Sequence, residues 1–192
     1  MSISVGGWIS WAEQRVGPGQ KTNSGVNPVL GAFLHSAEGY ANGLWSVLAD
    51  VSPPLEQRVS WHLSNLIDGR LVQHYSLQAQ CWHATAANTA YIGIEHEGKV
   101  PEEPTLTPAQ IATTRRVIAE ISQHYGWTPR RPTSATDLTA TLYEHSEIVR
   151  WPGGKGSRCP SGRIPWDLIL AGGDMTDEEK FLYTEAFKTL MR

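Results

Sequence analysis

The pattern of apolar and polar residues predicts several short strands. An apolar run at residues 30–35 is typical of a buried strand, and it ends at His35. Apolar and polar residues alternate within residues 58–75 around an Asp68-Gly69 turn, which predicts a β-hairpin. A further strand, at residues 91–98, carries charge at its C-terminal end. Because charge is rarely buried without a purpose, we expect that strand end to face a functional site.

Helical patterns lie between these strands. Residues 37–50 form a predicted helix that faces inward through Leu44, Leu48 and Trp45 and ends before Pro53-Pro54. The clearest helix begins at Thr107, the N-cap of a capping box with Gln110, and ends at Gly126; its apolar residues recur at helical spacing, namely Ile111, Ile118, Ile121 and Tyr125.

The remaining segments are less regular. We expect a short helix at residues 8–15, loops at 16–27, 81–84 and 129–139, a strand at 140–144 and a helix or turn at 166–170. Residues 171–173 resemble a hinge before a last helix. The fold class expected is α/β, a central mixed sheet flanked by helices in a single domain. We divide the chain into an N-terminal segment packed on the domain (1–29), the domain (30–170) and a C-terminal helix (171–192).

Composition narrows the function classes. The chain has 192 residues, 40% of them hydrophobic and 18% charged, with a net charge of −3 and no basic block. This balance indicates a globular protein and argues against a nucleic-acid binder. The N-terminus has no signal-peptide pattern and no segment reaches transmembrane length, so we expect synthesis in the cytoplasm without membrane insertion.

Three residues suggest a metal site. His145 and Cys159 share one loop-rich segment, and His35 follows the first strand. Two imidazoles and a thiolate suit Zn²⁺ and leave a fourth position open. The spacing is not that of a tight pair of cysteines, so the residues alone make a zinc hydrolase one candidate among others. A disulfide between Cys159 and Cys81 is the alternative.

The other histidines have simpler explanations when each is taken alone. We interpret His62 as a structural histidine within the hairpin and His83 as a loop residue. His74 and His124 are interpreted as surface or helix-end residues without a role.

Several motifs, in this order, resemble one known family. They are Leu34-His35-Ser36, Trp61-His62-Leu63 before an Asp-Gly turn, Trp82-His83-Ala84, Ile92-Gly93-Ile94-Glu95, His145-Ser146-Glu147 and Cys159-Pro160. The chain resembles, from about residue 30 to residue 166, the zinc-dependent N-acetylmuramoyl-L-alanine amidases of the amidase-2 and peptidoglycan-recognition-protein group, many of which are phage endolysins.

The resemblance implies roles for individual residues. His35, His145 and Cys159 would bind Zn²⁺, and Glu95 would be the catalytic base. The substrate-binding residues would be Trp61, Trp82, His83, Ser157 and Arg158. Many relatives carry a lysine two residues before the last ligand, where this chain has Ser157. Some carry a tyrosine where this chain has Trp61. Both differences concern how the transition state is stabilised.

The implied activity is hydrolysis of the amide between N-acetylmuramic acid and L-alanine in bacterial peptidoglycan by a monomeric, cell-wall lytic endolysin released at phage lysis. Two alternatives stay open at this point. One is a non-lytic peptidoglycan-binding module, and the other is a cytosolic amidase that recycles muropeptides.

Overall fold

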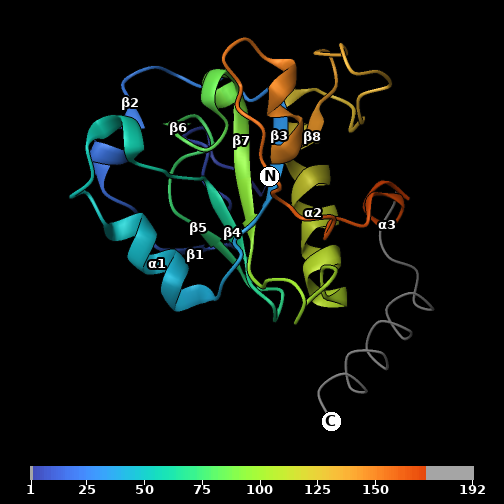
Figure 1. Ribbon diagram of the computed structural model, residues 1–192, viewed down its shortest axis with the longest axis horizontal. Coiled ribbons are helices and arrows are strands. Elements are labelled where there is room, and N and C mark those ends of the chain that lie inside the picture. Colours follow the sequence, from blue (N-terminus) through green and yellow to red (C-terminus); the bar gives the residue numbers. More distant parts are fainter. Residues whose placement is uncertain (1, 172–192) are drawn as a thin grey trace.

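The structure, a computed structural model, describes residues 2–171 and has a six-stranded mixed sheet. The sheet lies at the centre of the described part of the chain (Figure 1). The strands lie in the order β1-β5-β4-β7-β3-β8, and β4–β5 is the antiparallel pair. Their bounds are β1 Glu13–Gln14, β3 Gly31–Ser36, β4 Leu63–Asn65, β5 Leu71–Gln73, β7 Tyr91–His96 and β8 Leu142–Glu144. The predicted α/β class with a mixed sheet is therefore confirmed.

One face of the sheet packs against the long helix α2, Pro108–Tyr125. Along β3 and β7, alternate residues belong to the core cluster that also contains the apolar side of α2; the cluster includes Ala32, Leu34, Ile92, Ile94, Ile111, Val117, Ile118 and Ile121. Side chains alternate between the two faces of a strand. Phe33, His35, Gly93 and Glu95 therefore lie on the opposite face, which α2 does not cover.

The helix α2 begins and ends as its sequence predicts. The Thr107 hydroxyl accepts a hydrogen bond from the backbone N–H of Gln110, and the Gln110 side chain accepts one from the backbone N–H of Thr107. Gly126 ends the helix in a left-handed conformation, with φ 76°. The helix α1, Ala41–Ala49, buries Leu44 and Leu48 in a second cluster with Trp61, Tyr75 and Cys81. It is shorter than predicted because Glu38 has a positive φ of 47° and Gly39 forms an isolated bridge with Gly98, so the helix begins only at Ala41.

The predicted helix at residues 8–15 is wrong. Ile3 and Ile9 form an isolated antiparallel bridge around the Gly6-Gly7 turn, and both side chains lie in the main core. Glu13 and Gln14 then form β1, which pairs in parallel with β5. Tertiary packing of two isoleucines and an edge strand outweighs the local helical tendency here. The N-terminal segment, residues 1–29, also contains η1, Gly19–Lys21, and β2, Thr22–Asn23. β2 pairs with β6, Gln80–Cys81.

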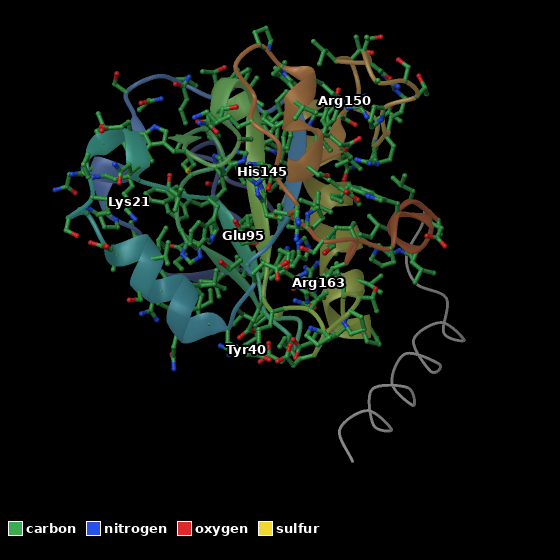
Figure 2. The ribbon with its side chains drawn as sticks, in the orientation of Figure 1. Lys21, Tyr40, Glu95, His145, Arg150 and Arg163 are labelled. Atoms are coloured by element: carbon green, nitrogen blue, oxygen red, sulfur yellow. The ribbon has the colours of Figure 1, made fainter. Side chains whose placement is uncertain are left out.

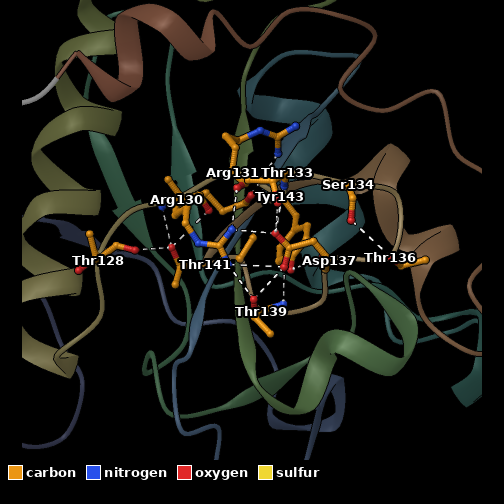
Figure 3. Close-up of polar contacts among 12 residues, drawn as sticks. Thr128, Arg130, Arg131, Thr133, Ser134, Thr136, Asp137, Thr139, Thr141 and Tyr143 are labelled. Carbon is orange, nitrogen blue, oxygen red and sulfur yellow. Dashed lines mark hydrogen bonds and ion pairs between the residues drawn. The ribbon is translucent and has the colours of Figure 1, made fainter.

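The loop between α2 and β8 is fixed by one carboxylate (Figure 3). The Asp137 side chain accepts hydrogen bonds from the Arg130 guanidinium, at 2.7 Å, and from the backbone N–H groups of Thr133 and Thr139. These donors hold the pKa of Asp137 well below its usual range. The Tyr143 hydroxyl donates to the carbonyl of Asp137, at 3.0 Å. The irregular loop is therefore tied to β8, which leads to the candidate site.

The other predicted strands and helices are present within residues 2–171, whereas the 3-10 turns were not predicted and Cys81, expected in a loop, belongs to β6. The hairpin at residues 58–75 is confirmed, although its strands are short, and 3-10 turns form η2 (Leu55–Gln57), η3 (Thr85–Thr89) and η4 (His145–Arg150). Residues 166–170 form the short helix α3, Trp166–Leu170. The predicted hinge and last helix fall beyond Ala171, outside the described residues. Within residues 2–171, no helix has the length and apolar character needed to cross a membrane.

The interpretation of His74 as a surface residue is wrong. Its ring is fully buried, and the Nδ1–H group donates to the carbonyl of Arg15 at 2.9 Å. Its Nε2 accepts from the Ser64 hydroxyl, which in turn accepts from the Trp61 indole N–H. His62 is the structural histidine that was expected: it is fully buried, its Nε2–H donates to the carbonyl of Ala79, and its Nδ1 accepts from the backbone of Gly93.

These buried rings predict how stability depends on pH. Burial lowers the pKa of His62 and of His74 from 6.5 to about 4. Between these values the unfolded chain binds protons more readily than the folded chain. The stability contributed by the neutral rings is therefore complete above pH 6.5 and is lost as the pH falls toward 4, with a slope of about 1.4 kcal/mol per pH unit for each ring.

Urea unfolding measured between pH 7 and pH 4 tests this prediction. His74→Asn keeps a donor for the Arg15 carbonyl and cannot titrate, so its slope with pH should be shallower than that of the parent protein. His124→Asn changes an exposed ring and should leave the slope unchanged. Equal slopes for the parent and His74→Asn would contradict the assignment.

Candidate metal centre and active site

Three side chains from distant parts of the chain come together at one end of the sheet. His35 lies near the end of β3, His145 is the first residue of η4, directly after β8, and Cys159 lies in the loop before α3. One potential ligand atom from each side chain lies within 4.8 Å of the other two. Figure 2 shows His145 and Glu95 in the middle of the view, near the ribbons of β7 and β3.

The parallel strands explain the position of the two histidines. β7 and β8 both pair with β3 in parallel, so the C-terminal ends of the three strands lie at the same end of the sheet. The rings of His35 and His145 have centroids 4.7 Å apart. Beneath them, Phe33 stacks on Tyr143 with ring centroids 5.2 Å apart, and Trp151 packs against both. This aromatic cluster supports the start of η4.

Backbone hydrogen bonds bring Cys159 to the histidines. The Cys159 Sγ accepts a hydrogen bond from the backbone N–H of Ser36, at 3.1 Å, and the carbonyl of Cys159 accepts one from the N–H of Ser146, at 2.7 Å. Cys159 is therefore tied to the residues that follow His35 and His145. Cys81 is buried in the cluster around α1, and both cysteines are free thiols, so the disulfide alternative is wrong.

Glu95 lies beside His35 because the two residues are register partners in the pairing of β3 with β7. Its Oε1 is 3.8 Å from His35 Nδ1, and only 15% of its side chain is exposed. Its other oxygen, Oε2, is buried and finds no hydrogen-bond partner among residues 2–171. Burial, and then the charge of Glu38, raise the pKa of Glu95 to about 8. A carboxyl group with such a pKa can accept and return a proton near neutral pH.

Two clefts open beside these residues. A cleft of about 510 Å³ is lined by His145, Trp82 and His83, together with Leu55, Glu56, Arg58 and Val59. A cleft of about 360 Å³ is lined by Glu95, Ser36 and Trp61, together with residues of α1. Val59 lines both. His145 therefore borders one cleft and Glu95 borders the other.

The predicted substrate-binding residues differ in their exposure. Trp82 is partly exposed in the larger cleft, whereas Trp61 is only 3% exposed and donates its indole N–H to the Ser64 hydroxyl. Ser157 accepts a hydrogen bond from the backbone N–H of Cys159, at 3.1 Å, and so shapes the turn before the thiol. The side chain of Arg158 is exposed. Ser157 and Arg158 line neither of the two clefts.

The sequence did not reveal the role of Arg163, which is fully buried. Its guanidinium donates to the Ser36 hydroxyl at 2.8 Å and to the carbonyl of Glu97 at 2.9 Å, and its Nε donates to the carbonyl of Glu103 at 2.7 Å. It thereby holds the residue whose N–H contacts Cys159. The available signal was a lone arginine between apolar neighbours, which is a weak one, because most arginines are exposed.

Comparisons with solved structures reveal the same fold. The N-acetylmuramoyl-L-alanine amidase LysC from Clostridium intestinale URNW is 15% identical, with a TM-score of 0.58, over 83% of this chain and 95% of that one. AmpD, in a selenomethionine derivative, is 21% identical, with a TM-score of 0.63, over 89% of this chain and 98% of that chain. PlyL is 13% identical, with a TM-score of 0.60, over 86% and 99%. A search of curated protein sequences gives no match.

A comparison with protein families assigns the chain. Residues 25–162 match the Amidase_2 family, described as N-acetylmuramoyl-L-alanine amidase, and this match spans more than half of the sequence. It includes all three clustered side chains and Glu95. The resemblance seen in the sequence motifs is confirmed, and the chain belongs to the N-acetylmuramoyl-L-alanine amidase family of enzymes.

Proposed function

We propose that this protein is a zinc-dependent amidase that cleaves the bond between N-acetylmuramic acid and L-alanine in bacterial cell walls. In this proposal His35, His145 and Cys159 hold the zinc ion. The observation that carries the proposal is the clustering of their ligand atoms within 4.8 Å, beside Glu95, whose Oε2 has no hydrogen-bond partner among residues 2–171. We assign catalysis to residues 30–170, with residues 1–29 as a segment packed against them.

The donor set fits zinc. Two imidazoles and one thiolate are ligands that Zn²⁺ prefers, and three protein ligands leave a position for water or substrate. Burial, and then the charge of Glu95, raise the pKa of the Cys159 thiol. A divalent cation between these groups would oppose both effects, because it stabilises the thiolate and offsets the carboxylate charge.

The residues around the proposed zinc site would each have a different role in the reaction. When bound, zinc would polarise the scissile carbonyl and lower the pKa of a water molecule. Oε2 of Glu95, which has no partner in the described part of the chain, would accept the proton of the attacking water and deliver it to the leaving amine. Trp82 and His83 would line the larger cleft for the substrate, and Trp61 would border the smaller one. Ser157 and Arg158 are the candidates for contacts that relatives make through a lysine.

Lysis of the cell wall is our preferred biological role, since two solved structures of similar fold are described as endolysins. Recycling of soluble muropeptides is the second candidate, because the same two clefts would also admit a short substrate. A binding module without activity is the weaker alternative, since all three candidate ligands and the carboxylate are present in one cluster.

The first prediction concerns the metal. The protein as purified should contain about one zinc ion per chain, and Cys159→Ser should lose both the zinc and the amidase activity because a neutral hydroxyl is a poor ligand. Elemental analysis and release of new amino termini from purified cell walls measure the two quantities. Cys81→Ser is the matched control and should keep its zinc. Full activity after chelation would contradict the proposal.

The second prediction separates the base from the ligands. Glu95→Gln should retain zinc and lose about 10²- to 10⁴-fold in turnover, since an amide cannot carry the proton. Glu102→Gln changes an exposed carboxylate, paired with Lys99, and should behave as the parent protein. The assignment of Glu95 is wrong if Glu95→Gln cleaves cell walls at the parental rate.

The third prediction separates lysis from recycling. A lytic enzyme should solubilise intact sacculi at low enzyme concentration and cleave soluble anhydro-muropeptide less efficiently. Comparing kcat/KM for soluble muropeptide with the rate of sacculus clearing decides between the two roles. The lytic role would be overturned if only the soluble substrate were cleaved.

A further inference from the structure

His83 forms a hydrogen-bonded chain that ends at one of the candidate zinc ligands. Its Nε2 lies 3.1 Å from the carbonyl oxygen of Tyr91. A carbonyl has no proton to donate, so Nε2 of His83 must carry one. The Tyr91 carbonyl also accepts from the Asn27 side chain, at 2.9 Å, which fixes its position from the N-terminal segment.

The other nitrogen of His83 faces His35. Nδ1 of His83 lies 3.2 Å from Nε2 of His35, and both rings are buried, with 8% and 2% exposed. Buried imidazoles are favoured in the neutral form, which carries one N–H. Since His83 already carries its proton on Nε2, its Nδ1 is an acceptor, and Nε2–H of His35 is the donor. This leaves the lone pair of His35 on Nδ1, the nitrogen 3.8 Å from the Glu95 carboxylate.

The position of the His83 ring is built into its surroundings. A Cβ atom placed on Gly93 would lie 2.7 to 2.9 Å from three atoms of the ring, so only glycine leaves room for the imidazole against β7. The Asn88 side chain accepts hydrogen bonds from the backbone N–H groups of His83 and Ala84 and so holds the start of η3. The ring therefore cannot turn easily, and its acceptor stays aimed at His35.

From this geometry we infer that His83 is a positioning residue, which fixes His35 in the tautomer whose Nδ1 is free to bind the metal. The inference rests on the proposed zinc site and adds a role for a residue that the sequence motifs suggested only as part of the groove. Partners of this kind orient a ligand before the ion arrives, and their loss typically weakens metal binding about 10- to 100-fold.

The tautomer can be measured without any metal or activity. Long-range ¹H–¹⁵N spectra of the metal-free protein, labelled with ¹⁵N-histidine and recorded near pH 7.5, distinguish the two neutral forms of each ring. His35 and His83 should both carry the proton on Nε2. A proton on Nδ1 of His35 would overturn the inference.

Two substitutions of similar shape test the consequence for metal binding. In His83→Asn, the Oδ1 atom can take the place of Nδ1 and accept from His35, whereas His83→Leu has nearly the same volume and no acceptor. Zinc affinity, measured by competition with a chromophoric chelator, should fall about 10- to 100-fold in His83→Leu and by a clearly smaller factor in His83→Asn. His124→Ala removes an exposed histidine and should leave the affinity unchanged.

The outcomes separate this inference from the proposed function. A parent protein that binds no zinc would refute the zinc site, while the spectra would still report the tautomer. A parent that binds zinc, with Leu and Asn variants equally weakened or equally unaffected, would refute the role of His83 alone. If His83→Leu does not fold, as judged by circular dichroism, two measurements still test the role of His83. They are the zinc affinity of His83→Asn relative to the parent and the tautomer of His35 in the spectra of the parent.

Discussion

The site depends on one geometric constraint, the two-residue period of the parallel strands β3 and β7. Ala32, Leu34, Ile92 and Ile94 are buried in the core cluster shared with α2, so the intervening residues must lie on the other face. His35 and Glu95 are register partners on that face, and their separation is set by the spacing between neighbouring strands rather than by flexible loops. A slip of one residue in either strand would place its polar side chain in the apolar core.

The polar groups behind the site are satisfied almost completely. His62, His74 and Arg163 are fully buried, and each has hydrogen-bond partners in the backbone or in neighbouring side chains. Unpaired polar atoms in such an interior carry a penalty of about 1–3 kcal/mol each. Oε2 of Glu95 has no hydrogen-bond partner among residues 2–171, and the Glu95 side chain borders one of the two clefts.

The strand residues and the loop residues of the site are held in different ways. The histidine at a strand end and the carboxylate beside it are fixed by the sheet, whereas Ser157 and Arg158 belong to a loop held chiefly through the backbone of Cys159. A substitution in that loop leaves the strands and their register unchanged. Solved structures with 13–21% identity share the fold. This agrees with a fold that depends on the two-residue alternation along its strands and on strand register, rather than on particular loop residues.

The sequence by itself determined the local features. The capping box at Thr107 fixed the start of α2, the alternation within residues 58–75 predicted the hairpin, and the motif order indicated the family. These signals are readable because each depends on residues a few positions apart. The strand at Glu13–Gln14 was missed because its partner, β5, lies almost 60 residues later.

Only the tertiary structure decided how the buried polar residues are used. His74 lies in the interior because of contacts with Arg15 and Ser64, and His83 reaches a ring that is 48 positions away. Whether a histidine is exposed, structural or directed at a metal depends on which strand is its neighbour. The neighbouring strand is set by the order and register of the strands in the sheet. Neither can be predicted from the composition of a short segment.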